Sequence, residues 1–217
     1  MNPRPPPYHG GALPLSYRGN AARTSGRGKI IAAPGEPEQW APVYDPGMQL
    51  RLAEPHDAEP IRRIYNAEVL GSTATFDLRA RTVAEQAAWM AEHQGTYPVV
   101  VAVDEDGAVL GFGSLSTYRD RPSYSTTVEN SVYVDEGARG RGVGRALLDE
   151  LVRLGTIHGF HSMIARVGGG NAASIALHEA CGFEMVGVEK EIGRKFNRWL
   201  DVAVLQRMLG GDGFDPE

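Results

Sequence analysis

A glycine-rich turn between a strand and a long amphipathic helix constrains this chain most. Residues 139–145 read Arg-Gly-Arg-Gly-Val-Gly-Arg and follow a β-branched strand predicted over 126–134. The helix predicted over 142–159 carries apolar residues at three- and four-residue spacing. Such a turn lets the backbone approach a ligand closely, and the free N–H groups at the start of the helix form an anion site. We therefore expect an α/β fold with an anion-binding turn.

Two familiar phosphate-binding loops do not fit this turn. A Walker loop needs Lys and then Ser or Thr after its last glycine, but Val143 follows Gly142. The dinucleotide fingerprint needs Gly or Ala three residues after its second glycine, where Arg145 stands. The pattern that remains is Arg-x-x-Gly-x-Gly, formed by Arg139, Gly142 and Gly144. A plain glycine-rich turn with solvated arginines is the alternative interpretation.

The remaining elements follow in the order β-α-α-β-β-β-α-β-α-β-β. Strands are predicted over 48–52, 98–103, 109–118, 126–134, 163–167, 183–192 and 199–208, and helices over 58–71, 82–90, 142–159 and 171–181. Three consecutive strands in the middle indicate antiparallel pairing, whereas the strand-helix-strand passage over 126–167 indicates a parallel pair. The fold class is thus α/β, with a mixed, mostly antiparallel sheet of about seven strands flanked by helices.

Local signals fix three of these boundaries. Asp57 is a plausible N-cap for the helix at 58–71. Thr82 and Glu85 form a capping-box pattern at the start of the next helix. Residues 104–107, Asp-Glu-Asp-Gly, predict a hairpin turn between two β-branched strands.

The chain divides into an unusual start and an ordinary body. Residues 1–47 contain 16 Pro or Gly residues and no apolar periodicity, which favours a disordered extension. An over-extended start, with Met48 as the working initiator, and a targeting peptide are the alternatives, since the stretch carries arginines and no acid before Glu36. We expect the domain over 48–209 and a flexible tail over 210–217.

Charge and cysteine content narrow the partners. Residues 48–217 carry 17 basic and 24 acidic side chains, which argues against nucleic acid or an anionic membrane as a partner. No run of about 18 apolar residues predicts a membrane span. Cys181 is the only cysteine, so no disulfide within the chain and no cysteine-rich metal site are expected. A cytoplasmic location is the default for such a chain.

The turn and its surroundings resemble the GNAT acetyltransferase superfamily. Its pyrophosphate loop has the same Arg-x-x-Gly-x-Gly pattern, and residues 171–183 are similar to its Asn-x-x-(Ala/Ser)-x-x-Leu-Tyr-x-x-x-Gly-Phe block, with His178 in place of the tyrosine. The resemblance implies acetyl-CoA as co-substrate, no metal, and a sheet splayed by a bulge between its fourth and fifth strands. The implied acetyl-CoA contacts are Val132, Tyr133, Val134, Arg139, Gly140, Arg141, Gly142, Val143, Gly144, Arg145, Asn171 and Ser174.

A narrower resemblance covers residues 48–209. Residues 127–134, Thr-Val-Glu-Asn-Ser-Val-Tyr-Val, together with Leu-His-Glu at 177–179, look like the phosphinothricin and methionine sulfoximine acetyltransferases. This implies acetyl transfer to the α-amine of a small amino acid, by direct attack in a ternary complex. Relatives of this kind are homodimers in which the second subunit lends part of the pocket.

Two residues are candidates for proton transfer. Glu129 lies on the strand that should hold the co-substrate, so it can act as the base for the amine, directly or through a water. His178 can serve as acid or base near neutral pH. The alternatives are an ordinary polar residue on a sheet face for Glu129 and a structural helix histidine for His178. The other histidines show no metal-ligand spacing.

The acceptor needs cations and an apolar wall. The family resemblance places the cations at Arg119 and Lys195, with Lys195 acting across the subunit interface, and the wall at Phe76, Tyr118 and Tyr124. Solvated surface charges and core packing are the alternatives. For the whole chain, the alternatives are an acyl-CoA-binding sensor or scaffold without turnover, or the same chemistry on another amine or a peptide N-terminus.

Overall fold

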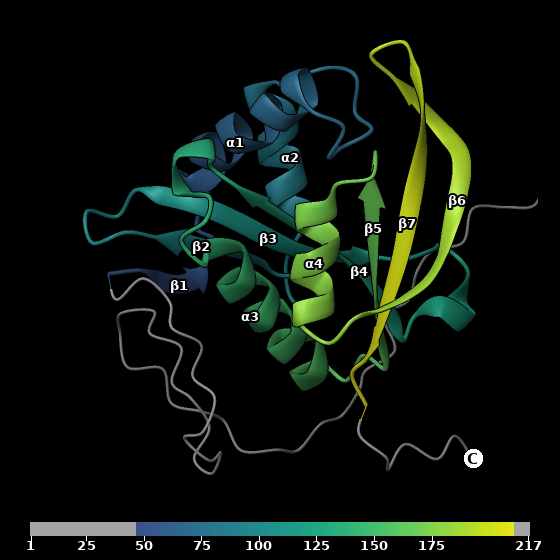
Figure 1. Ribbon diagram of the computed structural model, residues 1–217. Coiled ribbons are helices and arrows are strands. Elements are labelled where there is room, and N and C mark those ends of the chain that lie inside the picture. Colours follow the sequence, from purple (N-terminus) through teal and green to yellow (C-terminus); the bar gives the residue numbers. More distant parts are fainter. Residues whose placement is uncertain (1–46, 211–217) are drawn as a thin grey trace, which may run out of the picture.

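The computed structural model describes residues 47–210, so the expectations for 1–46 and 211–217 lie outside the described part. The described chain forms one seven-stranded sheet in the order β1-β2-β3-β4-β5-β7-β6 (Figure 1). Its strands are β1 (Gln49–Leu52), β2 (Val99–Val103), β3 (Val109–Thr117), β4 (Thr127–Val134), β5 (Ser162–Gly168), β6 (Glu184–Lys195) and β7 (Arg198–Met208). Only β4 and β5 are parallel neighbours, which confirms the mixed, mostly antiparallel fold class.

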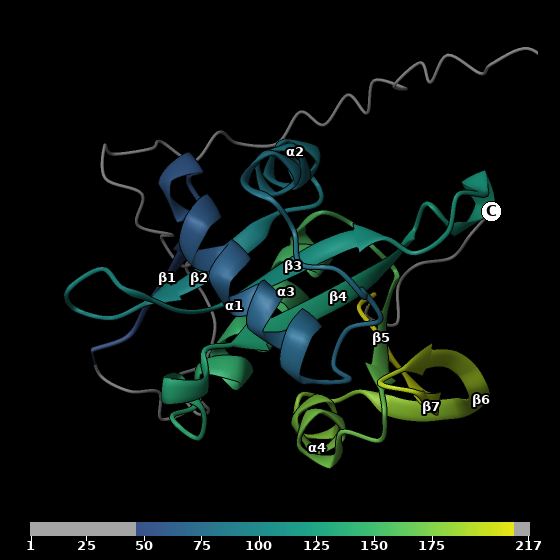
Figure 2. The same cartoon turned by 90° about the horizontal axis from the view of Figure 1, so that it is seen from above.

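The helices cover both faces of this sheet. They are α1 (Ala58–Gly71), α2 (Val83–Glu92), α3 (Val143–Ile157) and α4 (Ala172–Ala180), with short 3₁₀ helices at Pro55–Asp57, Pro122–Tyr124 and Glu136–Ala138. Viewed from above, α1 and α2 lie on one face and α4 lies on the other (Figure 2). Apolar residues of α3 pack against the even-numbered residues of β4 in a large core on one face of the sheet. Apolar residues of α1 pack in a separate core on the opposite face. We call these the α3 face and the α1 face.

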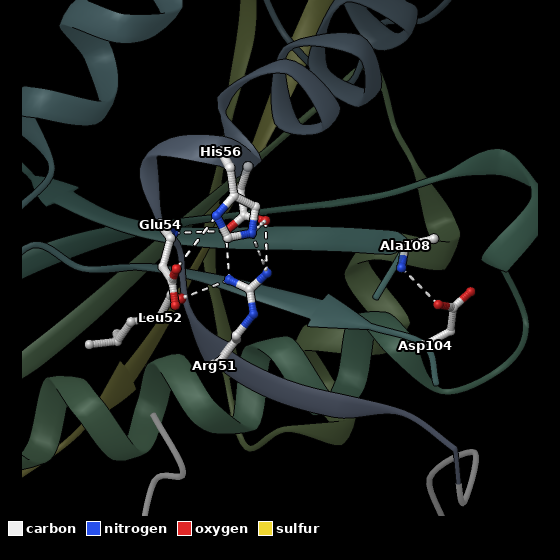
Figure 3. Close-up of polar contacts among 7 residues, drawn as sticks. Arg51, Leu52, Glu54, His56, Asp104 and Ala108 are labelled. Atoms are coloured by element: carbon white, nitrogen blue, oxygen red, sulfur yellow. Dashed lines mark hydrogen bonds and ion pairs between the residues drawn. The ribbon is translucent and has the colours of Figure 1, made fainter. Parts of the chain in front are cut away.

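The start of α1 is tied to the first strand by a buried carboxylate. Asp57 is 1% exposed, and its side chain accepts hydrogen bonds from Arg51 Nη1 at 2.6 Å and from the Glu54 backbone N–H at 2.7 Å. Figure 3 shows the Arg51 guanidinium beside Glu54 and His56. Asp57 occupies the expected N-cap position, but its side chain makes no capping bond to α1. The predicted N-cap position is confirmed, while the carboxylate itself pairs with Arg51 and the Glu54 N–H instead of capping α1.

The other local signals are confirmed. Thr82 and Glu85 form both bonds of the capping box at α2. The β2–β3 turn closes through Asp104, whose carboxylate accepts from the Ala108 N–H at 2.8 Å (Figure 3). Within residues 47–210, the chain contains no helix of the length and hydrophobicity that a membrane crossing requires.

The last hairpin differs from the prediction. The strand predicted over 183–192 continues past Gly193 to Lys195 as β6. The turn consists of only two residues, Phe196 and Asn197, and both have positive φ. Positive φ at both central positions gives a turn whose twist matches the strands. A phenylalanine rarely takes this conformation, so the sequence carries no strong signal for it.

Strands β4 and β5 separate after a short ladder. Four residue pairs join them, from Thr127–Ser162 to Asn130–Ala165, and both strands then continue without pairing to each other. This is the expected splay. The expected bulge is absent from the β3–β4 ladder, which keeps one register from Gly111–Val134 to Thr117–Val128. The splay therefore arises from divergence of two regular strands.

Candidate active site

A cavity of about 850 Å³ opens where β4 and β5 separate. Its walls come from the loop after α1, the second half of β4, the turn before α3, the end of β5 and the first turns of α4. Many of the predicted site residues line it: Phe76, Glu129, Val132, Tyr133, Val134, Arg139, Gly140, Gly142, Val143, Gly144, Arg145, Asn171, Ser174 and His178. Arg141 lies in the same turn but is not part of the cavity lining.

The turn before α3 has the geometry of an anion site. Gly140 and Gly142 have φ of 75° and 80°, which residues with a side chain rarely adopt. Gly142 is the N-cap of α3, and the first-turn N–H groups of a helix have no intrahelical partner. The helix dipole adds positive potential at this end. The turn therefore fits a pyrophosphate group, as expected for acetyl-CoA.

Arg139 is held across the mouth of the turn. Its guanidinium forms an ion pair with Glu68 of α1, which also accepts a hydrogen bond from Ser72 Oγ at 2.5 Å. Arg139 is 55% exposed and Glu68 is 12% exposed, so the pair spans the surface and the cavity wall. Glu68 was not a predicted site residue.

Strand β4 presents its backbone to the cavity beyond Asn130. Val132 and Val134 pack their side chains on the α3 face, and Tyr133 packs on the α1 face and stacks on Phe112 with ring centroids 5.2 Å apart. Because β5 has diverged, the backbone groups on that side of β4 have no ladder partner in β5. Unpaired backbone donors and acceptors suit an extended ligand such as the pantetheine arm.

Glu129 lies on the α1 face of β4. Its two neighbours in the strand, Val128 and Asn130, are buried on the opposite face. Burial raises the pKa of Glu129, the positive charge of Arg166 lowers that pKa, and the negative charge of Glu189 raises it. Burial is the largest of these effects. Glu129 thus lines the cavity as a desolvated carboxyl whose affinity for a proton is higher than usual, which is the property that a general base needs.

His178 lies on the other face, in a chain of hydrogen bonds. Its Nδ1 lies 2.7 Å from the Ser174 carbonyl, and its Nε2 lies 3.1 Å from Asn130 Oδ1. Asn130 in turn donates from Nδ2 to the Ile164 carbonyl at 3.1 Å. Burial lowers the pKa of His178, which favours the neutral ring. A neutral ring has one N–H, so a proton added at Nε2 would complete the bond to Asn130.

The two proton-transfer candidates do not contact each other. Glu129 and Asn130 are consecutive on β4, so their side chains leave opposite faces of the strand. His178 follows Asn130, and no hydrogen bond joins it to Glu129 within the described part of the chain. The two candidates for proton transfer are therefore separated, one on each face of the splay.

Asn171 acts at the start of α4. It is the N-cap of that helix, and its side-chain oxygen accepts from the Ser174 N–H at 3.1 Å. Asn171 therefore caps α4. The same residue also lines the cavity with Ser174 and His178.

Four predicted acceptor contacts do not reach the cavity lining. Tyr118 and Tyr124 pack edge to face at 5.6 Å, with Arg119 over the Tyr118 ring at 4.8 Å, beyond the far end of β3. Lys195 is 4% exposed, and its Nζ donates to the Thr75 carbonyl at 2.8 Å. Burial lowers the pKa of Lys195. Lys195 thus ties the loop after α1 to the end of β6.

Phe76 lines the cavity and packs on two glycines. A Cβ at Gly193 would lie 2.2 Å from Phe76 Cε2, and one at Gly168 would lie 2.8 Å from Phe76 Cε1. The ring therefore occupies the space that side chains at these two positions would fill. With Lys195, these glycines hold the loop of residues 72–76 against β5 and β6.

Two lining residues that the sequence analysis missed stand out in their strands. Arg166 interrupts the apolar strand β5, and Asn130 is a polar residue at a buried position of β4. A charged or amide side chain within a buried strand is a usable signal, because burial without a partner is unfavourable. Among residues 47–210, no group of three or more His, Cys, Asp or Glu side chains is placed to hold a metal ion.

Comparisons with known proteins agree with this architecture. Residues 50–204 match the family model of the acetyltransferase (GNAT) domain. An L-methionine sulfoximine/L-methionine sulfone acetyltransferase from Pseudomonas paraeruginosa is 40% identical over 74% of this chain and 94% of its own length. A phosphinothricin N-acetyltransferase from Streptomyces coelicolor is 38% identical over 75% of this chain and 96% of its own.

A solved structure extends the match to three dimensions. The crystal structure of a GNAT superfamily phosphinothricin acetyltransferase from Sinorhizobium meliloti, in complex with acetyl-CoA, matches this chain with a TM-score of 0.75 and is 44% identical to it in sequence. The match covers 79% of this chain and 94% of that chain.

Proposed function

Since the chain belongs to the GNAT acetyltransferase family and is an acetyl-CoA-dependent N-acetyltransferase, we propose that its acceptor is the α-amine of a small amino acid. Acceptors of the phosphinothricin, methionine sulfoximine or methionine sulfone type are the first candidates, because these names belong to its relatives. The observation that carries the proposal is the desolvated carboxyl of Glu129 in the cavity at the splay.

The residues around the cavity divide the work of binding. The turn around Gly140 and Gly142 would hold the pyrophosphate of acetyl-CoA through backbone N–H groups. The unpaired side of β4 beyond Asn130 would hold the pantetheine arm. When bound, acetyl-CoA supplies an acetyl thioester to the amine in a ternary complex.

Proton transfer is the part that this chain's own side chains perform. An acceptor amine that binds as an ammonium must lose a proton, and Glu129 takes it at a carboxylate oxygen, directly or through a water. Attack of the amine on the thioester forms the amide bond and breaks the C–S bond, so CoA would leave as a thiolate. A proton added to His178 at Nε2, beside Asn130, would pass to that thiolate. Because the two groups lie on opposite faces, each handles a different proton.

We also propose that the protein forms a homodimer through its last hairpin. Strands β6 and β7 carry exposed apolar side chains that include Val186 at 55%, Phe196 at 51% and Trp199 at 61% exposure. Exposed apolar patches of this kind mark interaction sites. Our expected compartment is the cytoplasm, since the single cysteine, Cys181, is a buried free thiol.

Acetyl-CoA consumption, measured as released thiol at about pH 8, tests the acceptor proposal. The panel contains phosphinothricin, methionine sulfoximine, methionine sulfone, the common amino acids, simple amines and a short peptide. We expect saturable turnover with the sulfone or sulfoximine. Turnover with only the amines or the peptide would overturn the amino-acid assignment. Acetyl-CoA binding without turnover on any member would favour a sensor or scaffold.

A further inference from the structure

Arg166 occupies the point at which the sheet opens. The last residue pair between β4 and β5 joins Asn130 to Ala165, so Arg166 is the first β5 residue beyond the ladder. Its neighbours Ala165 and Val167 belong to the core on the α3 face. Alternation along the strand places the Arg166 side chain on the α1 face, the same face as Glu129.

A carboxylate anchors the Arg166 guanidinium without using all of its donors. Nη1 lies 3.2 Å from Glu189 Oε1, and Nη2 lies 2.5 Å from Glu189 Oε2. A guanidinium has five N–H donors in a rigid fork, and this pair uses two of them. The Arg166 side chain is 28% exposed and lines the cavity. Donors therefore remain for a second anion inside the cavity.

The other arginines of the described cavity lining lie at the opposite end of the cavity, near the start of α3. Arg139 pairs with Glu68, and Arg145 lies 3.5 Å from Asp149. Arg139 lies in the turn before α3 and Arg145 lies in the first turn of α3, where the pyrophosphate would bind. Arg166 is the arginine of this lining that shares the α1 face with Glu129.

We propose that Arg166 binds the α-carboxylate of the acceptor while Glu129 faces its α-amine, an inference that rests on the proposed amino-acid acetyltransferase function. An α-amino acid carries its carboxylate and its amine on one carbon, so it needs a cation and a base side by side. Arg166 and Glu129 supply this arrangement on one face of the splay. Glu189 holds the guanidinium in place. The acceptor class is thus free α-amino acids, in preference to amino-acid amides and simple amines.

The test compares three forms of one acceptor: methionine sulfone, its carboxamide and the corresponding decarboxylated amine. Wild type should prefer the free acid. In Arg166→Gln we expect kcat/KM for the acid to fall about 10–100-fold, through KM, because a charge-assisted hydrogen-bond pair is lost. At a pH above the acid limb of both enzymes, where Glu129 is ionised with or without Arg166, the decarboxylated amine should change less than about threefold, so the preference for the acid collapses.

Arg153→Gln is the matched control. Arg153 also forms an ion pair with a glutamate, Glu150, but it lies on α3 and does not line the cavity. This variant should keep the wild-type preference. Acetyl-CoA affinity, measured by calorimetry, should be unchanged in both variants. If Arg166→Gln does not fold, Arg166→Lys keeps the charge without the fork and should weaken the preference partly.

The outcomes separate two kinds of failure. A folded Arg166→Gln variant that still prefers the free acid as strongly as wild type would overturn the role of Arg166 alone. An Arg166→Lys variant with the full wild-type preference would count against it in the same way. Wild type that acetylates no amino acid at all would overturn the proposed function on which the inference rests.

Discussion

The two faces of β4 at the splay hold different polar chemistry, although Glu129 and Asn130 are neighbours in the chain. On the α1 face, Glu129 lies within the influence of a charged pair, Arg166 and Glu189. On the α3 face, Asn130 and His178 form a buried chain between two backbone carbonyls. On one face a buried carboxyl lies near two charged side chains, and on the other face the polar groups are joined by hydrogen bonds.

Under the proposed mechanism, this difference would let one strand serve two proton steps. A carboxylate that removes a proton from an amine works in its ionised form, and a nearby guanidinium supports that form. A buried histidine between carbonyl and amide oxygens exchanges a proton without a full ion pair. Alternation along β4 keeps the two environments apart, so each can be altered without the other.

Glu129→Gln should have the largest effect, because it removes the base and keeps the size of the side chain. We expect kcat to fall about 10²–10⁴-fold. Thiol release with the best amino-acid acceptor measures the loss, and calorimetry with CoA should show unchanged affinity. A Glu129→Gln variant with near-wild-type kcat would assign the base to another group.

His178→Gln should reduce kcat less, by about 10–100-fold, since a thiolate can also take its proton from water. The double variant Glu129→Gln/His178→Gln sharpens the comparison. If the faces handle different protons, the two losses should multiply, as they do for independent sites. A double variant no slower than Glu129→Gln would show that the residues act as one unit.

Gly193→Ala should disturb the α1 face alone. The new Cβ would meet the Phe76 ring at 2.2 Å, and overpacking of this kind costs about 1–3 kcal/mol. Chemical denaturation measures the loss of stability. Gly187→Ala, on the same strand, is the control because nothing lies within 4 Å of its Cβ. Equal stabilities of the two variants would contradict the packing of Phe76 on Gly193.

Much of this fold could be predicted from local patterns. The capping box at Thr82, the turn at Asp104 and the amphipathic helix after Gly142 carry their signals within a few residues. The cavity turn was also predictable, since glycines at Gly140 and Gly142 permit the positive φ that it requires.

The rest depends on contacts between distant segments. Lys195 was predicted as an acceptor contact from its charge and position in the sequence. In the structure its ammonium donates to the Thr75 carbonyl at 2.8 Å, a partner 120 residues away in sequence. The hairpin turn at Phe196 and Asn197 contains no glycine, so the sequence does not predict it. The pairing of Arg166 with Glu189 follows from strand order, which places β7 between their two strands.

The pH dependence of kcat/KM tests most directly that burial and the charges of Arg166 and Glu189 together set the pKa of Glu129. Burial raises the Glu129 pKa, so activity should be lost as pH falls at a higher pH than for an ordinary carboxyl group. Glu189→Gln removes a negative charge that raises this pKa, so the acid limb should move to lower pH. Glu59→Gln, in the exposed Arg62 pair of α1, should leave the limb in place. An acid limb that does not move in Glu189→Gln would contradict the account.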